Sequence, residues 1–207
     1  MKRVLEKVER RLGERLFLKG ARCAGPKCAA VRRGYPPGVR GKNSRRRNAS
    51  EYTSLIREKQ KIRYAYGLDD RQVQRYSAKA ASMPGVFATN FLAIVERRLD
   101  NVVFRLGLTD GRRNSRQAVS HGHVLVNGRA TNIPSYLVRV GDAIELKPSA
   151  HGSHHFAELD TRLKRYQAPS WLNIDAANRK GTVVASPDVA ALQMEAEVTK
   201  VKEFYSR

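Results

Sequence analysis

The sequence predicts an α+β protein. It has a helical first domain with a basic, loop-rich N-terminal segment, and an inserted small domain of two helices and a short, mostly antiparallel sheet. Apolar side chains recur at helical spacing through residues 50–66 and 89–106, which indicates amphipathic helices. Residues 123–126 alternate instead and lead to Asn127-Gly128, the commonest two-residue hairpin turn. A chain of 207 residues is long enough for one large domain or two small ones.

Apolar residues at helical spacing, together with capping and helix-ending residues, locate the expected helices. Asn48 or Ser50 suits an N-cap, and Gly67 and Gly107 suit helix ends. The expected helices span, in order, residues 4–18, 50–66, 70–83, 89–106 and 112–120. Asp100 is expected on the outer surface of the fourth helix, beside Arg97 and Arg98.

Two further strands are expected after the hairpin turn, SYLVRV (135–140) and AIELK (143–147). Beyond Ser149 the segment 151–167 could form a helix, and Trp171-Leu172 could dock against a core. A C-terminal segment is expected to begin at Pro187, because proline suits the first turn of a helix. The predicted division is a basic N-terminal extension (1–48), a helical domain (49–90 completed by 172–207) and a small domain with its following helix (91–171).

The charge of the chain indicates a polyanionic partner. The net charge is +21, from 40 Lys and Arg against 19 Asp and Glu. Ten of the basic residues lie between Lys19 and Asn48, where there is no acidic residue. Such a segment is either a solvated tail or an ordered phosphate-binding surface. No apolar run approaches the roughly 18 residues that span a bilayer, so nucleic acid is favoured over a membrane.

Few residues suit catalysis or metal binding. Cys23 and Cys28 supply at most half of a four-ligand zinc site, and His121 and His123 lack obvious partner ligands. The stretch RRLD, which ends at Asp100, resembles a pseudouridine synthase motif but lacks its glycine. Phosphate-binding, nucleophile-elbow and dinucleotide motifs are not seen. We therefore expect no enzyme, no cofactor and no small-molecule substrate.

Several ordered stretches carry a family resemblance. They are LFLKGARC, GPKCA, RRGYPPG, LIREKQK, RLDNVVFRLG, SHGHVLVNGR, PSYLVRVGD and EFYSR. From about Leu16 onward the chain resembles bacterial-type small ribosomal subunit protein four, the universal family that gives its name to a small RNA-binding domain. The resemblance implies a structural constituent of the small subunit. It further implies direct binding to the five-prime domain of 16S-type rRNA, nucleation of subunit assembly and a contribution to translational accuracy. The implied neighbours are ribosomal proteins three and five, near the mRNA entry channel.

The expected rRNA-binding residues combine the basic pattern with this resemblance. In the first two regions they are Lys19, Arg22, Lys27, Arg32, Arg33, Tyr35, Arg40, Lys42, Arg45, Arg46, Arg47, Tyr52, Arg57, Lys59, Lys61 and Arg63. In the small domain they are Arg112, Arg113, Arg116, Gln117, His121, His123, Asn127, Arg129 and Tyr136. Arginine and lysine suit phosphates, and aromatic rings and imidazoles suit bases and 2′-hydroxyl groups.

Two departures from the family pattern affect these expectations. Zinc-binding members carry a second cysteine pair upstream of Cys23, and residues 1–16 of this chain contain no cysteine. Gly111 stands where the family has a serine that caps the following helix, so this helix should start less firmly.

We expect a cytoplasmic protein, because residues 1–16 are charged throughout and resemble no leader. The resemblance implies in addition that it is ribosome-bound. An RNA-modifying enzyme and a free translational regulator are the alternatives.

Overall fold

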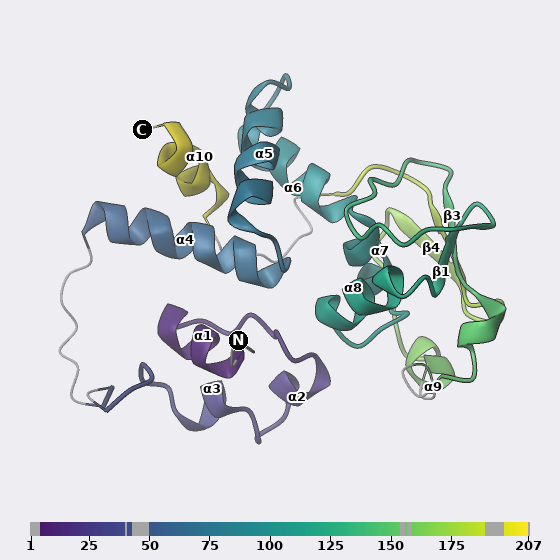
Figure 1. The fold of residues 1–207 in the computed structure, drawn as a ribbon, viewed down its shortest axis with the longest axis horizontal. Coiled ribbons are helices and arrows are strands. Elements are labelled where there is room, and N and C mark those ends of the chain that lie inside the picture. The colour runs from purple at the N-terminus through teal and green to yellow at the C-terminus, as the bar shows by residue number, and fades with distance from the viewer. Residues whose placement is uncertain are drawn as a thin grey trace. The chain divides into compact units, whose positions relative to one another are not determined.

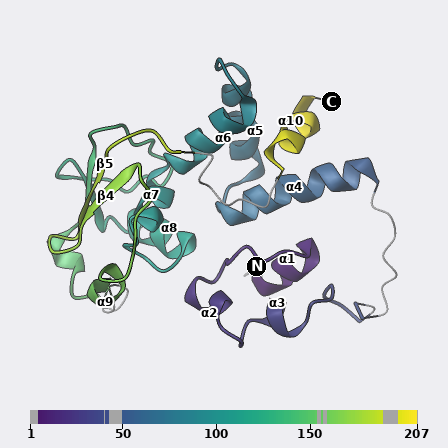
Figure 2. The ribbon, with the colours of Figure 1, turned by 180° about the vertical axis from the view of Figure 1, so that it is seen from behind.

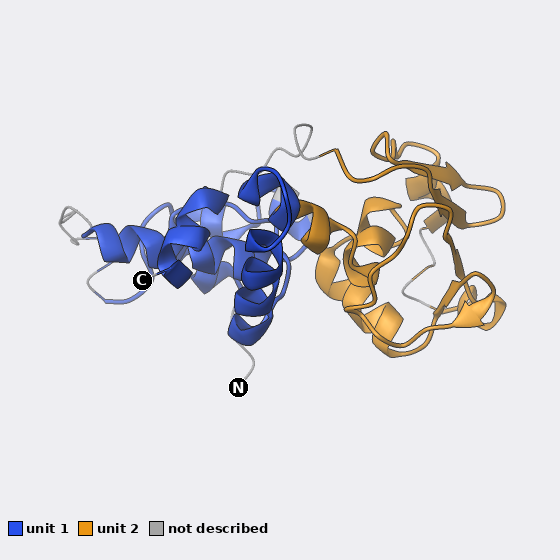
Figure 3. Cartoon of the chain, turned by 90° about the horizontal axis from the view of Figure 1, so that it is seen from above, with its two compact units in different colours: residues 1–91, 194–207 blue, residues 92–193 orange. Residues whose placement is uncertain are grey.

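The computed structural model describes residues 5–39, 41–42, 50–153, 156, 159–188 and 197–206. The chain forms two compact units, residues 1–91 with 194–207 and residues 92–193 (Figure 3). The basic N-terminal segment belongs to the first unit and is no separate extension. The expected assignment of 172–207 to the first unit is also corrected, because residues 172–193 belong to the second.

The first unit is helical (Figures 1 and 2). Its helices are α1 (Leu5–Leu12), α2 (Ala21–Ala24), α3 (Ala29–Arg32), α4 (Glu51–Ala65), α5 (Asp70–Ala81), the first half of α6 (Phe87–Glu96) and α10 (Val198–Ser206). The first helix is shorter than expected, because the chain leaves it at Gly13, where φ is +80°.

Local caps and a shared core define α4, α5 and α10. The Ser50 hydroxyl accepts a hydrogen bond from the Thr53 amide and caps α4, as expected. Asp69 and Gln72 form a capping box at α5. The C-terminal helix α10 lies against α4 and α5 (Figure 1). Buried apolar side chains fill the space between these helices, among them Leu55, Ile62, Val73, Tyr76, Val198 and Val201.

The second unit combines helices with an antiparallel sheet, which confirms the α+β class. After α6 come α7 (Leu99–Arg105), α8 (Arg112–Ser120), β1 (Val124–Val126), β2 (Arg129–Ala130), β3 (Ala143–Leu146), η1 (Pro148–Ala150), α9 (Leu159–Leu163), β4 (Leu172–Asp175) and β5 (Lys180–Val183). The strand order is β2-β1-β3-β5-β4, and each neighbouring pair is antiparallel.

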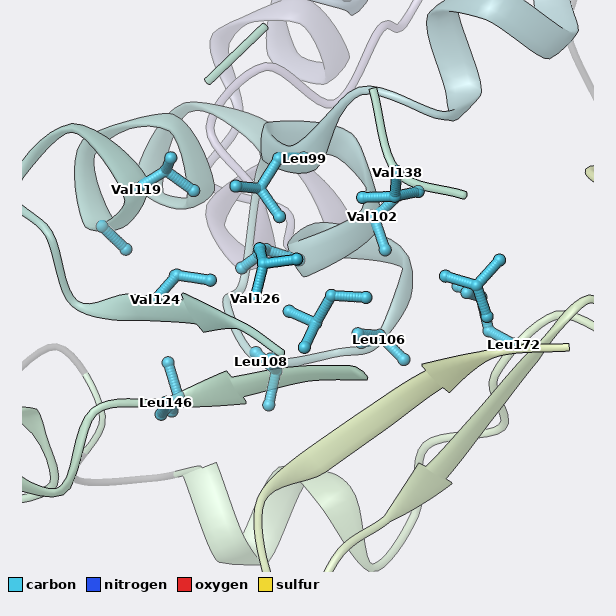
Figure 4. Close-up of a cluster of buried hydrophobic side chains, with 14 of the residues drawn as sticks. Leu99, Val102, Leu106, Leu108, Val119, Val124, Val126, Val138, Leu146 and Leu172 are labelled. Atoms are coloured by element: carbon cyan, nitrogen blue, oxygen red, sulfur yellow. The ribbon is translucent and has the colours of Figure 1, made fainter. Parts of the chain in front are cut away.

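One hydrophobic core holds the second unit together (Figure 4). Val124 and Val126 point into this core from β1, as the alternation predicts. The core also contains Leu99, Val102, Leu106, Leu108, Val119, Val138, Leu146, Trp171 and Leu172. Gly181 of β5 packs against Leu106 so closely that an added Cβ would clash with the Leu106 methyl groups. Burial of Trp171 agrees with the docking role expected for Trp171-Leu172.

The single helix expected over residues 89–106 is divided at Arg97-Arg98. Arg98 adopts an extended conformation and forms an isolated antiparallel bridge with Leu137. The Leu99 amide donates to the Tyr136 carbonyl at 2.8 Å, and the Val138 amide donates to the Arg97 carbonyl at 2.9 Å. Residues 135–140, which were expected to form a strand, instead contribute Leu137 to this isolated bridge. Amphipathic spacing could not reveal the break, because it continues in phase on both sides.

The sheet is completed by residues that the sequence placed elsewhere. β5 pairs with β3 through Ala143–Thr182 and Ile144–Gly181, and β4 then pairs with β5. These pairings draw residues 172–183 into the second unit. The segment expected as a helix over 151–167 contains only the short α9 among its described residues.

Asp100 is buried, which corrects its expected place on the helix surface. Its exposed fraction is 4%, and its two carboxylate oxygens accept hydrogen bonds from the Arg98 guanidinium at 3.0 and 2.6 Å. Arg98 is itself fully buried. A buried charge needs such a partner, because its desolvation is costly.

We predict that Asp100→Ala destabilises the second unit by about 3–5 kcal/mol, because it leaves the Arg98 charge buried without its carboxylate. Urea unfolding followed by Trp171 fluorescence measures this loss. Asp110→Ala, at an exposed position, is the control and should stay within about 0.5 kcal/mol of the parent. Equal stability of both variants would contradict the assigned role of the pair.

Candidate nucleic-acid interface

Exposed basic side chains follow the N-terminal segment of the first unit. Lys27, Arg32, Arg33 and Lys42 are exposed, and the Arg22 side chain is 61% exposed. The chain is ordered there by short turns and by α2 and α3. Of the two interpretations left open by the charge pattern, an ordered surface fits this part of the segment. Lys19 and Arg22 both face the Glu6 carboxylate, at 3.2 and 3.4 Å, so part of their charge is neutralised.

Two cations lie close to the Tyr35 ring. The Arg10 guanidinium carbon lies 5.0 Å from the ring centroid, and the Lys42 ammonium lies 5.7 Å from it. Arg10 also donates from Nε to the Arg33 and Tyr35 carbonyls. The ring is half-buried and serves first to order the basic loop. Sequence reasoning missed Arg10 because the residue lies in a mixed-charge helix.

Two of the expected RNA contacts on α4 are engaged inside the first unit. Lys59 and Lys61 are each 6% exposed. Lys59 Nζ lies 3.0 Å from the Asp70 carboxylate, and Lys61 pairs with Glu14 and Glu58. Burial alone would lower the pKa of Lys61, but the hydrogen bonds with both glutamates outweigh it and raise the pKa. Both lysines therefore have structural roles inside the first unit.

The C-terminal helix supplies the aromatic cover of Lys59. The ammonium lies 3.9 Å from the Phe204 ring centroid and 5.6 Å from that of Tyr205. Tyr52 stacks on Phe204 with centroids 6.1 Å apart. Burial raises the pKa of Tyr205 to about 12, and the nearby Asp70 charge adds to the shift. Phe204 and Tyr205 thus anchor the C-terminal helix to the rest of the first unit.

A basic groove of about 500 Å³ lies between α1 and α4. Its lining includes Lys7, Arg11, Gln60, Arg63 and Tyr64. Arg63 was expected at the interface, although its Nε also donates to the Leu68 carbonyl. Lys7 and Arg11 were missed, because acidic neighbours in α1 conceal them in a charge count. Arg57, elsewhere on α4, is exposed.

In the second unit the expected contacts follow α8 and the β1–β2 hairpin. Gly111 precedes α8 without any side-chain cap, as its sequence predicts. Arg113 and Gln117 are exposed, and Arg116 is half-buried. Arg112 has a structural role as well, because its Nε donates to the Asn101 side chain at 2.8 Å and its guanidinium carbon lies 4.7 Å from the Phe104 ring centroid. The described positions of Arg113 and Gln117 support an outward-facing polar edge on this helix.

The chain leaves α8 through Gly122, where φ is +71°, and enters the hairpin. His121 is exposed, and its ring centroid lies 5.8 Å from that of half-buried His123, which meets Phe156 edge-on. Arg129 and Tyr136 are exposed. Asn127 is used to build the turn, because its side chain donates to Asp142 and accepts from the Ala143 amide.

Four of the expected arginines lie outside the described residues: Arg40, Arg45, Arg46 and Arg47. His154 and His155 also lie outside them. The candidate interface therefore consists of the exposed basic and aromatic side chains among the described residues.

The positions of Arg105 and Arg112 depend on a residue that sequence reasoning missed. Glu96 is fully buried, and its carboxylate accepts from Arg105 Nε and Nη2 at 2.9 and 2.8 Å. It also accepts from the Asn101 amide at 2.6 Å and lies 3.9 Å from Arg112. In the sequence, Glu96 reads as one charge in an amphipathic helix, and no local signal distinguishes it.

Cys23 and Cys28 are buried and are not disulfide-bonded. Together with Glu9 they place three possible donor atoms within 4.8 Å of one another. Burial raises the pKa of the Cys23 thiol, and this favours the neutral form. In the part of the chain that the structure describes, no helix is long and apolar enough to cross a membrane.

Comparison with known proteins agrees with this arrangement. Residues 2–96 match the model of the ribosomal protein S4/S9 N-terminal domain, and residues 97–144 match that of the S4 domain. The small ribosomal subunit protein uS4 of Halothermothrix orenii is 48% identical over 96% of this chain and 94% of its own length. The uS4 proteins of Syntrophomonas wolfei and Pelotomaculum thermopropionicum are each 46% identical, with the same coverage.

The chain belongs to the uS4 family. The match confirms the resemblance drawn from the sequence, and the family is a structural, non-enzymatic component of the ribosome. The alternative of an RNA-modifying enzyme is therefore set aside. Burial of Asp100 against Arg98 agrees with this outcome, since it occupies the one carboxylate that resembled a catalytic residue.

We predict that the first unit loses stability as the pH rises from about 10 to about 12. The pKa of Tyr205 is raised from 10.0 to about 12, so in this window the folded chain keeps a proton that the unfolded chain releases. This contribution is fully present below pH 10 and is lost as the pH rises through the folded-state pKa. The raised pKa of Lys61 acts in the same direction.

Tyr205→Phe should flatten the alkaline fall in unfolding free energy, measured by urea unfolding with circular dichroism. Tyr136→Phe, in the second unit, serves as the matched control. The same alkaline slope in the parent and in Tyr205→Phe would show that the phenol does not contribute.

Proposed function

We propose that this protein is a structural constituent of the small ribosomal subunit. It binds 16S-type rRNA directly through the exposed basic side chains of its two units. The observation that carries the proposal is the match to uS4 proteins over 96% of the chain. The charges support it. Glu14, Glu58, Asp70 and Asp100 are used in internal ion pairs, while Arg32, Arg33, Arg113 and Arg129 remain exposed. Because these carboxylates are paired inside the protein while the arginines are exposed, the surface suits binding to a phosphate backbone.

The proposed contacts differ in chemistry between the units. In the first unit, Arg22, Lys27, Arg32, Arg33, Lys42 and Arg57 bind phosphates, and Arg40 with Arg45–Arg47 extends this set from the sequence. In the second unit, Arg113, Arg116, Gln117 and Arg129 bind the backbone. His121, His123 and Tyr136 can hydrogen-bond or stack on unpaired bases. Contacts of this kind need side chains held on rigid elements, and the hydrophobic core shared by α8 and the β1–β2 hairpin holds them in place.

The finer parts of the proposal follow the family resemblance. We infer binding to the five-prime domain of the rRNA, nucleation of subunit assembly, and a contribution to translational accuracy near the mRNA entry channel. Ribosomal proteins three and five of the small subunit are the inferred protein neighbours, and the inferred location is the cytoplasmic ribosome.

We predict that Arg113→Ala and Arg129→Ala each weaken binding to a 16S five-prime-domain transcript. Each should also reduce the slope of log affinity against log salt by about 0.7–0.9, because each removes one phosphate contact. Filter binding at several salt concentrations measures both quantities. Lys180→Ala, which removes a cation already facing Glu145, is the matched control and should leave the slope unchanged. A parent slope near zero would overturn the electrostatic basis of the proposal.

Sucrose-gradient sedimentation of the tagged protein tests the ribosomal assignment. We expect stoichiometric migration with the small subunit that survives a high-salt wash, because a core component is held by many contacts at once. Migration at the top of the gradient, or release by the wash, would favour the free translational regulator instead.

A further inference from the structure

The buried cluster of Glu9, Cys23 and Cys28 raises the question of a metal ion. All three side chains are 1% exposed, and their donor atoms lie within 4.8 Å of one another. A closed structural zinc site takes four protein donors. Among the described residues no fourth His, Cys, Asp or Glu joins the group. Glu6, one turn earlier, is directed to Lys19 and Arg22. The donor set therefore does not complete a structural zinc site.

The Glu9 carboxylate is already occupied by the backbone. Its Oε1 accepts hydrogen bonds from the Leu16 and Leu18 amides, each at 3.1 Å. Its Oε2 lies 3.9 Å from Cys23 Sγ, whose thiol points to it as a weak donor. Cys23 Sγ in turn accepts from the Lys19 amide at 3.3 Å. The two side chains thus hold three amides of one short segment.

The Leu16 and Leu18 amides converge on one carboxylate oxygen, in the manner of an anion-binding nest. Phe17, between the two amides that bind Glu9, has a φ of +52°, which a bulky residue rarely adopts. A residue in this left-handed conformation turns the neighbouring amides toward a common point, where they form a concavity that attracts an anion. The Phe17 side chain is 53% exposed, so core packing does not impose the conformation. The buried carboxylate supplies the compensating interaction.

We propose that the Glu9 carboxylate organises the N-terminal basic segment in place of a structural metal ion, so that this segment folds without zinc. The carboxylate fills the nest at Leu16–Leu18 and joins α1 to the segment that leads into α2. Arg15 completes the junction by donating to the Cys23 carbonyl at 2.6 Å. Cys28 then acts as a small buried apolar side chain, which is the commonest role of free cysteine, and Cys23 adds weak sulfur hydrogen bonds with the Lys19 amide and the Glu9 carboxylate. This inference is independent of the proposed rRNA binding.

The two explanations predict opposite effects of substitution. If Glu9 organises the segment, the Leu16 and Leu18 amides depend on the carboxylate and not on the thiols. If a zinc ion organises it, those amides depend on the thiols and on the metal. Glu9→Gln keeps the size of the side chain and one acceptor oxygen but removes the charge. Cys23→Ser with Cys28→Ser removes both soft ligands and keeps a small side chain at each position.

The test measures zinc content and amide exchange on the full chain. The protein is incubated with zinc sulfate, passed through gel filtration and analysed by mass spectrometry for bound metal. Hydrogen exchange of the Leu16 and Leu18 amides is followed with and without a chelator, and Glu203→Gln at an exposed position is the control. We expect well under one zinc per chain and exchange that is insensitive to the chelator. Glu9→Gln should speed exchange by about tenfold or more, because a charge-assisted hydrogen bond is lost. The double serine variant should stay within about threefold of the parent.

Three results would overturn the proposal. The first is one zinc ion per chain that survives gel filtration and whose removal speeds exchange at Leu16 and Leu18. The second is unchanged exchange in Glu9→Gln. The third is loss of protection in the double serine variant with retention in Glu9→Gln. Because none of these measurements involves RNA, they leave the ribosomal assignment to its own tests.

Discussion

The second unit depends on the buried carboxylate of Glu96. This one group accepts hydrogen bonds from Asn101 and Arg105, at the point where α6 ends and α7 begins. Asn101 then accepts from Arg112, so the same network reaches the first turn of α8. A buried charge is tolerated only with several such partners. The need to satisfy Glu96 therefore fixes how α7 and α8 meet, and with them the arginines that follow along α8.

Internal and external uses of basic residues compete throughout this chain. A strongly basic protein must still bury enough surface to fold, and some of its cations are recruited for that purpose. Lys59, Lys61, Arg98 and Arg105 each pair with an internal carboxylate. Arg32, Arg33, Arg113 and Arg129 remain exposed. The proposed RNA surface is what remains after these structural needs are met, which is why it is smaller than the basic pattern suggests.

Buried carboxylates organise both units by related means. Glu9 binds backbone amides around α1, and Glu96 binds side chains around α7. In each case the chain departs from helical conformation, at Phe17 or at Arg97-Arg98. A buried carboxylate on a neighbouring residue stabilises this departure. Both departures occur within or beside sequences of good helical spacing. The hydrogen bonds that stabilise these points form only in the folded chain, and local propensity carries no trace of them.

The sequence by itself determined the fold class, the helices from residue 50 to residue 83, α8, and the hairpin at Asn127-Gly128, because each depends on local periodicity, caps or turn chemistry. It also determined the family and the basic character of the surface. Only the tertiary structure decided that α6 and α7 are separate, that residues 172–183 complete the sheet, and that Asp100, Lys59 and Lys61 are buried. These features depend on pairing between distant segments and on the cost of burying charge, which become definite only when the chain is folded.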